Sequence, residues 1–167
     1  MTPSGHLDTD PRWQGLFSDQ AALAEQVGRW QVDQAVPEGI ADVLRVARAL
    51  LVDSYHVYEY SLVAITWSLL AAEASLHGCL PVEDEQQDRR TFGTLVTQAK
   101  DRGLITKKEA GVLYQVVGLR NDVVHRGYLR PKPSPQSYSP HDVMEYLEAI
   151  HLAVSDIYHR AADARSR

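Results

Sequence analysis

The side chains best suited to chemistry in this 167-residue sequence lie together in one six-residue stretch. The stretch contains Arg120, Asn121 and His125. A guanidinium keeps its positive charge at any pH that a folded protein tolerates, whereas an imidazole titrates at about pH 6.5, close to neutrality. The stretch therefore combines a permanent cation with a titratable base.

Helix geometry places these side chains on two faces. Successive residues are about 100° apart around a helix, so the apolar residues between Val112 and Val124 form one stripe that includes the position of Arg120. Asn121 and His125 lie on the opposite side, about 100° and 140° around the helix from Arg120. A charged guanidinium within an apolar stripe needs a partner or a wet cleft.

Glu73 offers a structural explanation for Arg120. It is the lone charged residue at the end of a long apolar stretch, and it is the obvious partner if the two helices touch. Arg120 and Glu73 would then form a buried ion pair, and the negative end of the helix dipole would stabilise His125. Helix geometry leaves this explanation open beside a chemical one.

The basic residues are concentrated in the same part of the chain, although the whole chain has a net charge of −5. Residues 89–132 contain ten Lys and Arg and three acidic residues, a net charge of +7. The rest contains seven basic and nineteen acidic residues, a net charge of −12. Because screening limits attraction to a Debye length of roughly 8–10 Å, such a segment can attract phosphate locally. Solvated helix faces explain the same pattern.

Length and composition indicate one globular domain, since 44% hydrophobic and 23% charged residues are enough for a sizeable core. A single cysteine excludes an internal disulfide framework, and the first residues do not resemble a secretory signal. The longest charge-free apolar stretch is 13 residues, Tyr60–Ala72, against about 20 needed to cross a bilayer. We expect a soluble, cytoplasmic protein without membrane contact.

Two parts of the chain are expected, an N-terminal arm with a short helix over residues 1–36 and a helical bundle over residues 37–167. Within the arm we expect residues 1–17 to be loose. Ser18 is expected to cap a short helix over residues 19–31.

The bundle is expected to begin with a long helical stretch. No Gly or Pro occurs between Gly39 and Gly78, and we expect a break at Asp53–Ser54 because both residues are good N-caps. The second piece, residues 55–77, is apolar nearly all round. This is typical of the central helix of a bundle, or of a helix that also faces a partner subunit.

Capping patterns define the remaining helices. Thr91 is expected to cap a short helix, and Thr106 with Glu109 forms a capping box for a helix running to about Arg126. Ser139 starts the last helix after a polar, proline-rich loop. The sequence therefore predicts an all-α antiparallel up-and-down bundle of four to five helices.

The motif and its position resemble the HEPN superfamily, small all-α domains found in RNA-cleaving toxins, CRISPR-associated nucleases and RNA-processing enzymes. The match is Arg120, Asn121, three residues and His125, followed by Gly127, late in the penultimate helix. The likeness extends in outline from about residue 38 to residue 160.

The resemblance implies a metal-independent endoribonuclease. In this family the RNA 2′-hydroxyl attacks the adjacent phosphate and leaves a 2′,3′-cyclic phosphate and a 5′-hydroxyl. His125 would be the general acid or base, and Arg120 would hold the phosphate and its growing negative charge. Asn121 would orient the imidazole or bind the substrate.

The resemblance also implies partners. Family members pair two motif helices across a two-fold axis, so we expect a homodimer with a composite cleft, which suits the separation of Arg120 and His125. A toxin–antitoxin or phage-defence setting, with an antitoxin or another protein partner, is implied by the family only. RNA phosphates are expected to contact five further basic residues, Arg126, Arg130, Lys107, Lys108 and Lys132.

Two alternatives stay open. Many family members are non-catalytic modules that bind a protein partner or a small ligand, and the motif would also fit a buried polar network in a structural homodimer. The sequence has no His-x-x-x-His spacing and no glycine-rich phosphate loop, so we expect neither a metal nor another cofactor.

Overall fold

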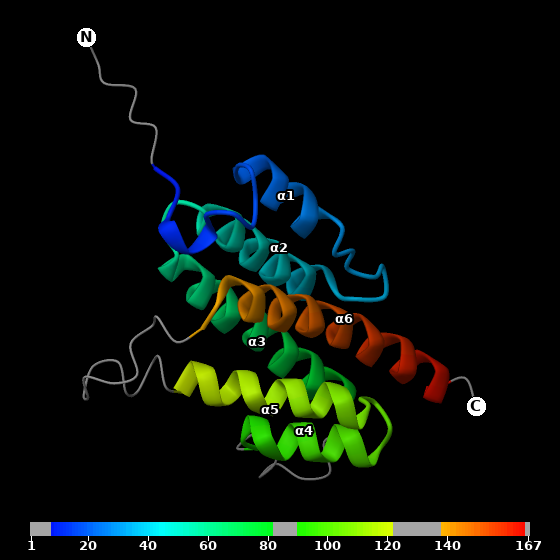
Figure 1. Ribbon diagram of the computed structural model, residues 1–167. Helices are drawn as coiled ribbons and strands as arrows, with labels where there is room; N and C mark the ends of the chain where they lie inside the picture. Colours follow the sequence, from blue (N-terminus) through cyan, green and yellow to red (C-terminus); the bar gives the residue numbers. More distant parts are fainter. Residues whose placement is uncertain (1–7, 82–89, 122–137, 166–167) are drawn as a thin grey trace.

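The computed structural model describes residues 8–81, 90–121 and 138–165. Within these ranges the chain is helical and has no strand, which confirms the all-α class (Figure 1). The described ranges form one short 3-10 helix and six α-helices: η1 (Pro11–Trp13), α1 (Gln20–Gly28), α2 (Glu38–Asp53), α3 (Glu59–Cys79), α4 (Phe92–Asp101), α5 (Lys107–Asn121) and α6 (Pro140–Arg165).

Side-chain caps start the last three helices where the sequence predicted them. The Glu109 amide donates to Thr106 Oγ1 at 3.2 Å, and the Glu109 carboxylate accepts from the Thr106 amide. At α6 the Asp142 amide donates to Ser139 Oγ at 3.2 Å, and the Ser139 amide donates to Asp142 Oδ2 at 3.1 Å. Thr91 caps α4. These bonds satisfy amides that the first turn of a helix leaves unpaired.

Residues 8–17 are packed against the bundle, so the prediction of a loose arm is wrong for this segment. Trp13 is fully buried, with its ring centroid 6.0 Å from that of Phe17 and 5.8 Å from that of Tyr58. It belongs to the same hydrophobic core as the helices of the bundle. The segment has no helical periodicity, so its sequence did not predict this packing. Burial of the large aromatic side chain of Trp13 holds the segment against the bundle.

The first α-helix differs from the prediction at both ends. Asp19, rather than Ser18, accepts a hydrogen bond from the Ala22 amide, at 2.8 Å. A carboxylate is favoured there because the helix N-terminus carries a partial positive charge. The helix ends at Gly28 rather than at residue 31.

α3 is the central helix, as predicted for residues 55–77, and the break that precedes it follows Asp53 as expected. It contacts α2, α4, α5 and α6 and runs through the middle of the bundle (Figure 1). Ser61, Ser68 and Ser75 recur every seven residues on α3 and are fully buried. Small side chains at such a contact allow helix axes to approach closely.

α3 is also the one helix in the described part of the chain that is long and apolar enough to cross a membrane. It has 21 residues because it includes the charged Glu59 and Glu73, which bounded the shorter apolar stretch counted in the sequence. Half of its most apolar part is buried within the bundle.

Candidate functional site

The sequence motif begins on the last turn of α5. The described part of this helix includes the backbone of Arg120 and reaches Asn121, which is exposed. The predicted end of the helix near Arg126 lies outside the described residues. His125 lies outside the described residues, and so do three of the predicted RNA contacts, Arg126, Arg130 and Lys132. Because only the backbone of Arg120 is described, its ion pair with Glu73 stays a prediction.

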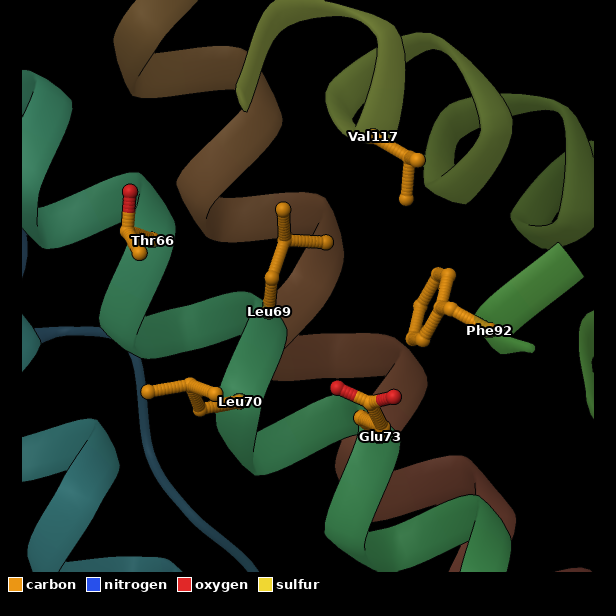
Figure 2. A pocket seen from close by; sticks show the side chains of 6 residues that line it. All are labelled: Thr66, Leu69, Leu70, Glu73, Phe92 and Val117. Carbon is orange, nitrogen blue, oxygen red and sulfur yellow. The ribbon is translucent and has the colours of Figure 1, made fainter. Parts of the chain in front are cut away.

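A small pocket lies beside this end of α5. Its volume is about 150 Å³, and α3, α4 and α5 line it with Thr66, Leu69, Leu70, Glu73, Phe92 and Val117. Figure 2 shows the Glu73 carboxylate pointing into the space between the helices, toward Phe92. Val117 precedes Arg120 by three residues, so the two positions lie on the same side of α5, about one turn apart.

The carboxylate of Glu73 sets the chemical character of the pocket. Glu73 is half-buried, and within the described residues no hydrogen bond or ion pair to it is formed. Apart from Thr66, its neighbours in the pocket wall are apolar. An ionised carboxylate in such surroundings favours a guanidinium or an amine as partner.

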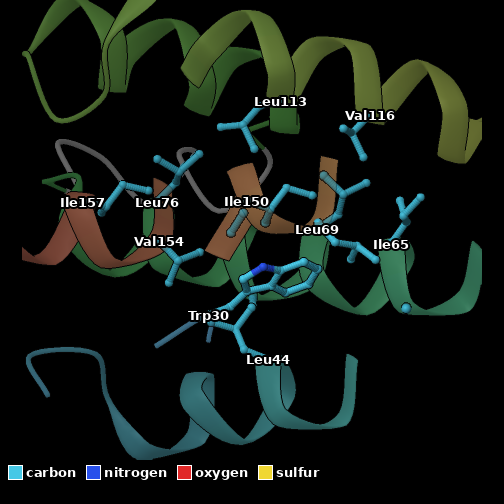
Figure 3. Packing of buried hydrophobic residues seen from close by; sticks show 14 of the residues in the cluster. Trp30, Leu44, Ile65, Leu69, Leu76, Leu113, Val116, Ile150, Val154 and Ile157 are labelled. Atoms are coloured by element: carbon cyan, nitrogen blue, oxygen red, sulfur yellow. The ribbon is translucent and has the colours of Figure 1, made fainter. Parts of the chain in front are cut away.

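α5 runs antiparallel to α3. Figure 3 shows Leu113 toward the Leu76 end of α3 and Val116 toward Ile65. The pocket continues this order, since Val117 shares it with residues in the middle of α3. The last turn of α5 therefore lies level with the middle of α3.

Lys107 and Lys108 are exposed at the opposite end of α5. At 1.5 Å per residue, the distance along the helix axis from Lys107 to Asn121 is about 20 Å. The two lysines share the α4–α5 turn region with the exposed Lys100 and Arg102. The structure thus separates two of the predicted phosphate contacts from the motif.

Arg160 of α6 fixes the first turn of α5. Its guanidinium donates to both oxygens of Glu109, at 2.8 and 3.2 Å, and to Asp156 at 2.9 Å. It also donates to the Leu104 carbonyl at 3.0 Å. Burial raises the pKa of Glu109, but hydrogen bonds from Arg160 and Thr106 outweigh burial and lower this pKa to about 2. The ionised pair ties α5 to α6.

Metal ligands do not cluster in the described part of the chain, where no group of three or more His, Cys, Asp or Glu side chains could hold an ion. His151 is buried between helices, with Nδ1 2.8 Å from the Leu147 carbonyl and Nε2 3.4 Å from the Leu44 carbonyl. Burial lowers the pKa of His151. This histidine links α2 and α6 through its two ring nitrogens.

Two residues of the pocket were not identified in the sequence. Thr66 precedes Glu73 by seven residues and therefore lies on the same face of α3, a spacing that could have pointed to it. Phe92 comes from α4, and its place in the pocket depends on how α4 packs against α3. No local pattern around Phe92 contains that information.

No model of a known protein family matches the chain, and neither does any curated protein or solved structure. The likeness to the HEPN superfamily therefore depends on the motif residues and on their place in the order of helices.

Proposed function

We propose that this protein is a metal-independent endoribonuclease of the HEPN type, a helical bundle with Arg120, Asn121 and His125 in its active site. The position of Arg120 and Asn121 carries this function: they are the last described residues of α5, beside the Glu73 pocket. Packed helices surround this end of α5 on one side, while Asn121 is exposed on the other. A guanidinium at the edge of an apolar site binds phosphate more strongly than one in bulk water.

The reaction needs no cofactor. A base takes the proton of an RNA 2′-hydroxyl, the 2′-oxygen attacks the adjacent phosphorus, and the bond from phosphorus to the 5′-oxygen breaks. An acid protonates the leaving 5′-oxygen, so the products are a 2′,3′-cyclic phosphate and a 5′-hydroxyl. His125 serves as the acid or the base, Arg120 stabilises the charge on the phosphate oxygens, and Asn121 positions the imidazole or the RNA.

The composite site implied by the HEPN resemblance requires a homodimer in which two motif helices face one another. The sequence predicts that Arg120 and His125 lie about 140° apart around one helix, so a second copy would supply the missing partner across a two-fold axis. We place the protein in the cytoplasm, in a toxin–antitoxin or phage-defence setting with an antitoxin or another protein partner. The single cysteine and the half-buried α3 suit that location.

The predicted phosphate contacts form two sets. Arg126, Arg130 and Lys132 follow the motif directly in the sequence. Lys107 and Lys108 lie about 20 Å away along α5, so they reach only an RNA strand that extends beyond the cleaved bond. These lysines add affinity for longer strands by neutralising phosphates, and that affinity weakens as salt increases.

Cleavage of end-labelled RNA by the pure protein in EDTA tests this function. The expected result is cleavage that leaves 2′,3′-cyclic phosphate ends, and its loss in the His125→Ala variant. RNA with 2′-O-methyl groups is the matched substrate control, since it lacks the attacking hydroxyl and should stay intact. Folded wild-type protein that leaves unmodified RNA intact would contradict the assignment.

A second candidate function is a non-catalytic module that binds a protein partner or a small ligand through the same cleft. The Glu73 pocket favours it, because a half-buried carboxylate among apolar walls suits a small organic cation or a basic side chain. Calorimetry with guanidinium and alkylamine probes tests this alternative. Saturable binding that Glu73→Gln abolishes, without RNA cleavage by the wild type, would favour the module.

A further inference from the structure

One face of α3 is apolar and open to solvent. Tyr60, Val63, Trp67 and Leu70 are 43%, 41%, 38% and 45% exposed. Their spacing of three, four and three residues is the pattern by which two helices pack along a common seam. These four residues are called the α3 stripe below. Large apolar side chains aligned on a surface mark a contact site more often than single exposed ones.

The α3 stripe is symmetric about residue 65. If a second α3 crosses there in the antiparallel direction, Tyr60 lies opposite the partner's Leu70, and Val63 lies opposite the partner's Trp67. Each pair then joins one aromatic and one aliphatic side chain, so bulky groups meet smaller ones. We propose that the α3 stripe is the contact surface of a homodimer, with the two α3 helices antiparallel across a two-fold axis.

The charges on α3 permit this self-association. α3 has no charged residue between Glu59 and Glu73, so two copies of the stripe bring no like charges together at its centre. Glu59, at one end, already accepts a hydrogen bond from Arg12 at 2.9 Å. The stripe has no charged residue that could pair with a strongly basic or acidic partner. A second copy of the stripe is itself uncharged and needs no complementary charge.

The exposed area matches the core of a dimer interface. With about 150–250 Å² for each large side chain, the exposed parts of the four residues provide about 300 Å² of apolar surface. A stable interface buries about 800 Å² per partner, with an apolar centre and a polar rim. The α3 stripe supplies the centre, and Thr66 and Glu73 flank it as polar rim residues.

The α3 stripe also adjoins the candidate site. Leu70 belongs to both the stripe and the wall of the Glu73 pocket. The last described turn of α5 lies level with the middle of α3 (Figure 3), and the proposed two-fold axis passes between the two α3 helices at residue 65, also near the middle of α3. Only one part of this inference rests on the proposed function: that pairing through α3 brings the motifs of two copies into one composite cleft.

Sedimentation of the full chain tests the surface without any RNA. We expect the wild type to sediment at twice the chain mass of 18.7 kDa. Trp67→Glu should weaken association by about 100-fold or more, as expected for an aromatic residue at the centre of an interface. Leu152→Glu is the matched control, because Leu152 is 57% exposed on α6 and is not part of the α3 stripe, so this variant should stay dimeric.

Three outcomes would contradict the proposed dimer surface: a monomeric wild type, a dimeric Trp67→Glu variant, or equal dissociation of the Trp67→Glu and Leu152→Glu variants. Far-UV circular dichroism verifies that each variant is folded. If Trp67→Glu does not fold, Val63→Glu replaces it as the stripe variant. If the wild type is dimeric but does not cleave RNA, and Trp67→Glu dissociates the dimer, the ribonuclease function is contradicted and the dimer surface is supported. An active monomer would contradict both the surface and the composite site, and would leave only the ribonuclease activity.

Cysteine cross-linking tests the antiparallel orientation. In a Cys79→Ser background, Val63→Cys and Trp67→Cys proteins are mixed and oxidised. Antiparallel pairing predicts disulfides between the two different variants, because residues 63 and 67 lie opposite each other. Cross-links formed mainly within each variant alone would show parallel helices and contradict the antiparallel orientation.

Discussion

Thr66 of α3 and Val117 of α5 line the same small pocket, and this relationship fixes where the motif lies on the bundle. Since α5 is antiparallel to α3, its last turn is level with the middle of α3. The centre of the α3 stripe lies at the same level. The end of α5 is therefore next to both the candidate site and the proposed dimer surface.

Arg120→Ala separates a catalytic role from a structural one. We expect RNA cleavage to fall by about 10²–10³-fold, the cost of removing one group that stabilises the transition state, while the free energy of unfolding changes little. Urea unfolding and cleavage assays on the same preparation measure both. A stability loss of about 3–5 kcal/mol, the cost of breaking a buried ion pair if Arg120 and Glu73 form one, with no cleavage by the wild type, would favour the structural network.

Arg160→Ala should loosen the attachment of α5 to α6. The variant leaves the Glu109 carboxylate and the Leu104 carbonyl without their shared donor, so we expect a loss of about 2–3 kcal/mol in unfolding free energy. Arg45→Ala is the control, since Arg45 pairs with Asp42 on the exposed face of α2 and should contribute less than about 0.5 kcal/mol. Equal effects in the two variants would contradict the role given to Arg160.

His151 should make the fold sensitive to mild acid. Burial lowers its pKa and the nearby Arg48 charge adds to this, although the Leu147 and Leu44 carbonyls oppose them. The unfolded chain, with an ordinary pKa of about 6.5, therefore binds a proton more readily than the folded one. Stability is complete above about pH 6.5 and falls as the pH decreases below it, by at most about 1.4 kcal/mol per pH unit.

Urea unfolding between pH 7 and pH 5, in steps of about half a unit, measures this loss, and the curve of His151→Gln should be flatter. Unchanged curves for the two proteins would show that protonation of His151 is not linked to folding.

Much of the fold could be predicted because local signals and packing agree. The capping box at Thr106 and the cap at Ser139 involve residues only three positions apart, so the sequence contains the whole interaction. Trp13 shows the opposite case. Its burial depends on Tyr58, 45 positions later in the chain, and no periodicity around Trp13 indicates that contact.

The candidate site could be predicted only in part for the same reason. The capping box and spacing predicted a helix from Thr106 to about Arg126 that includes Arg120 and Asn121, and the described part of α5 reaches Asn121. The predicted end near Arg126 lies outside the described residues. The pocket residue Phe92 and the distance of Lys107 from Asn121 depend on how helices pack and on where α5 begins. Charge counts along the sequence grouped Lys107 with the motif, whereas helix length separates them by about 20 Å.

Mixed dimers test the central claim, that two copies joined through α3 form one RNA-cleaving site. Arg120→Ala and His125→Ala proteins, each inactive alone, are mixed and allowed to exchange subunits before RNA is added in EDTA. If Arg120 of one copy works with His125 of the other, activity should return to about a quarter of the wild-type level, since about half of the dimers are mixed and each retains one of two equivalent residue pairs. Adding Trp67→Glu to both proteins should abolish the recovery. A mixture that exchanges subunits and stays inactive, beside an active wild type, would contradict a site shared between two copies.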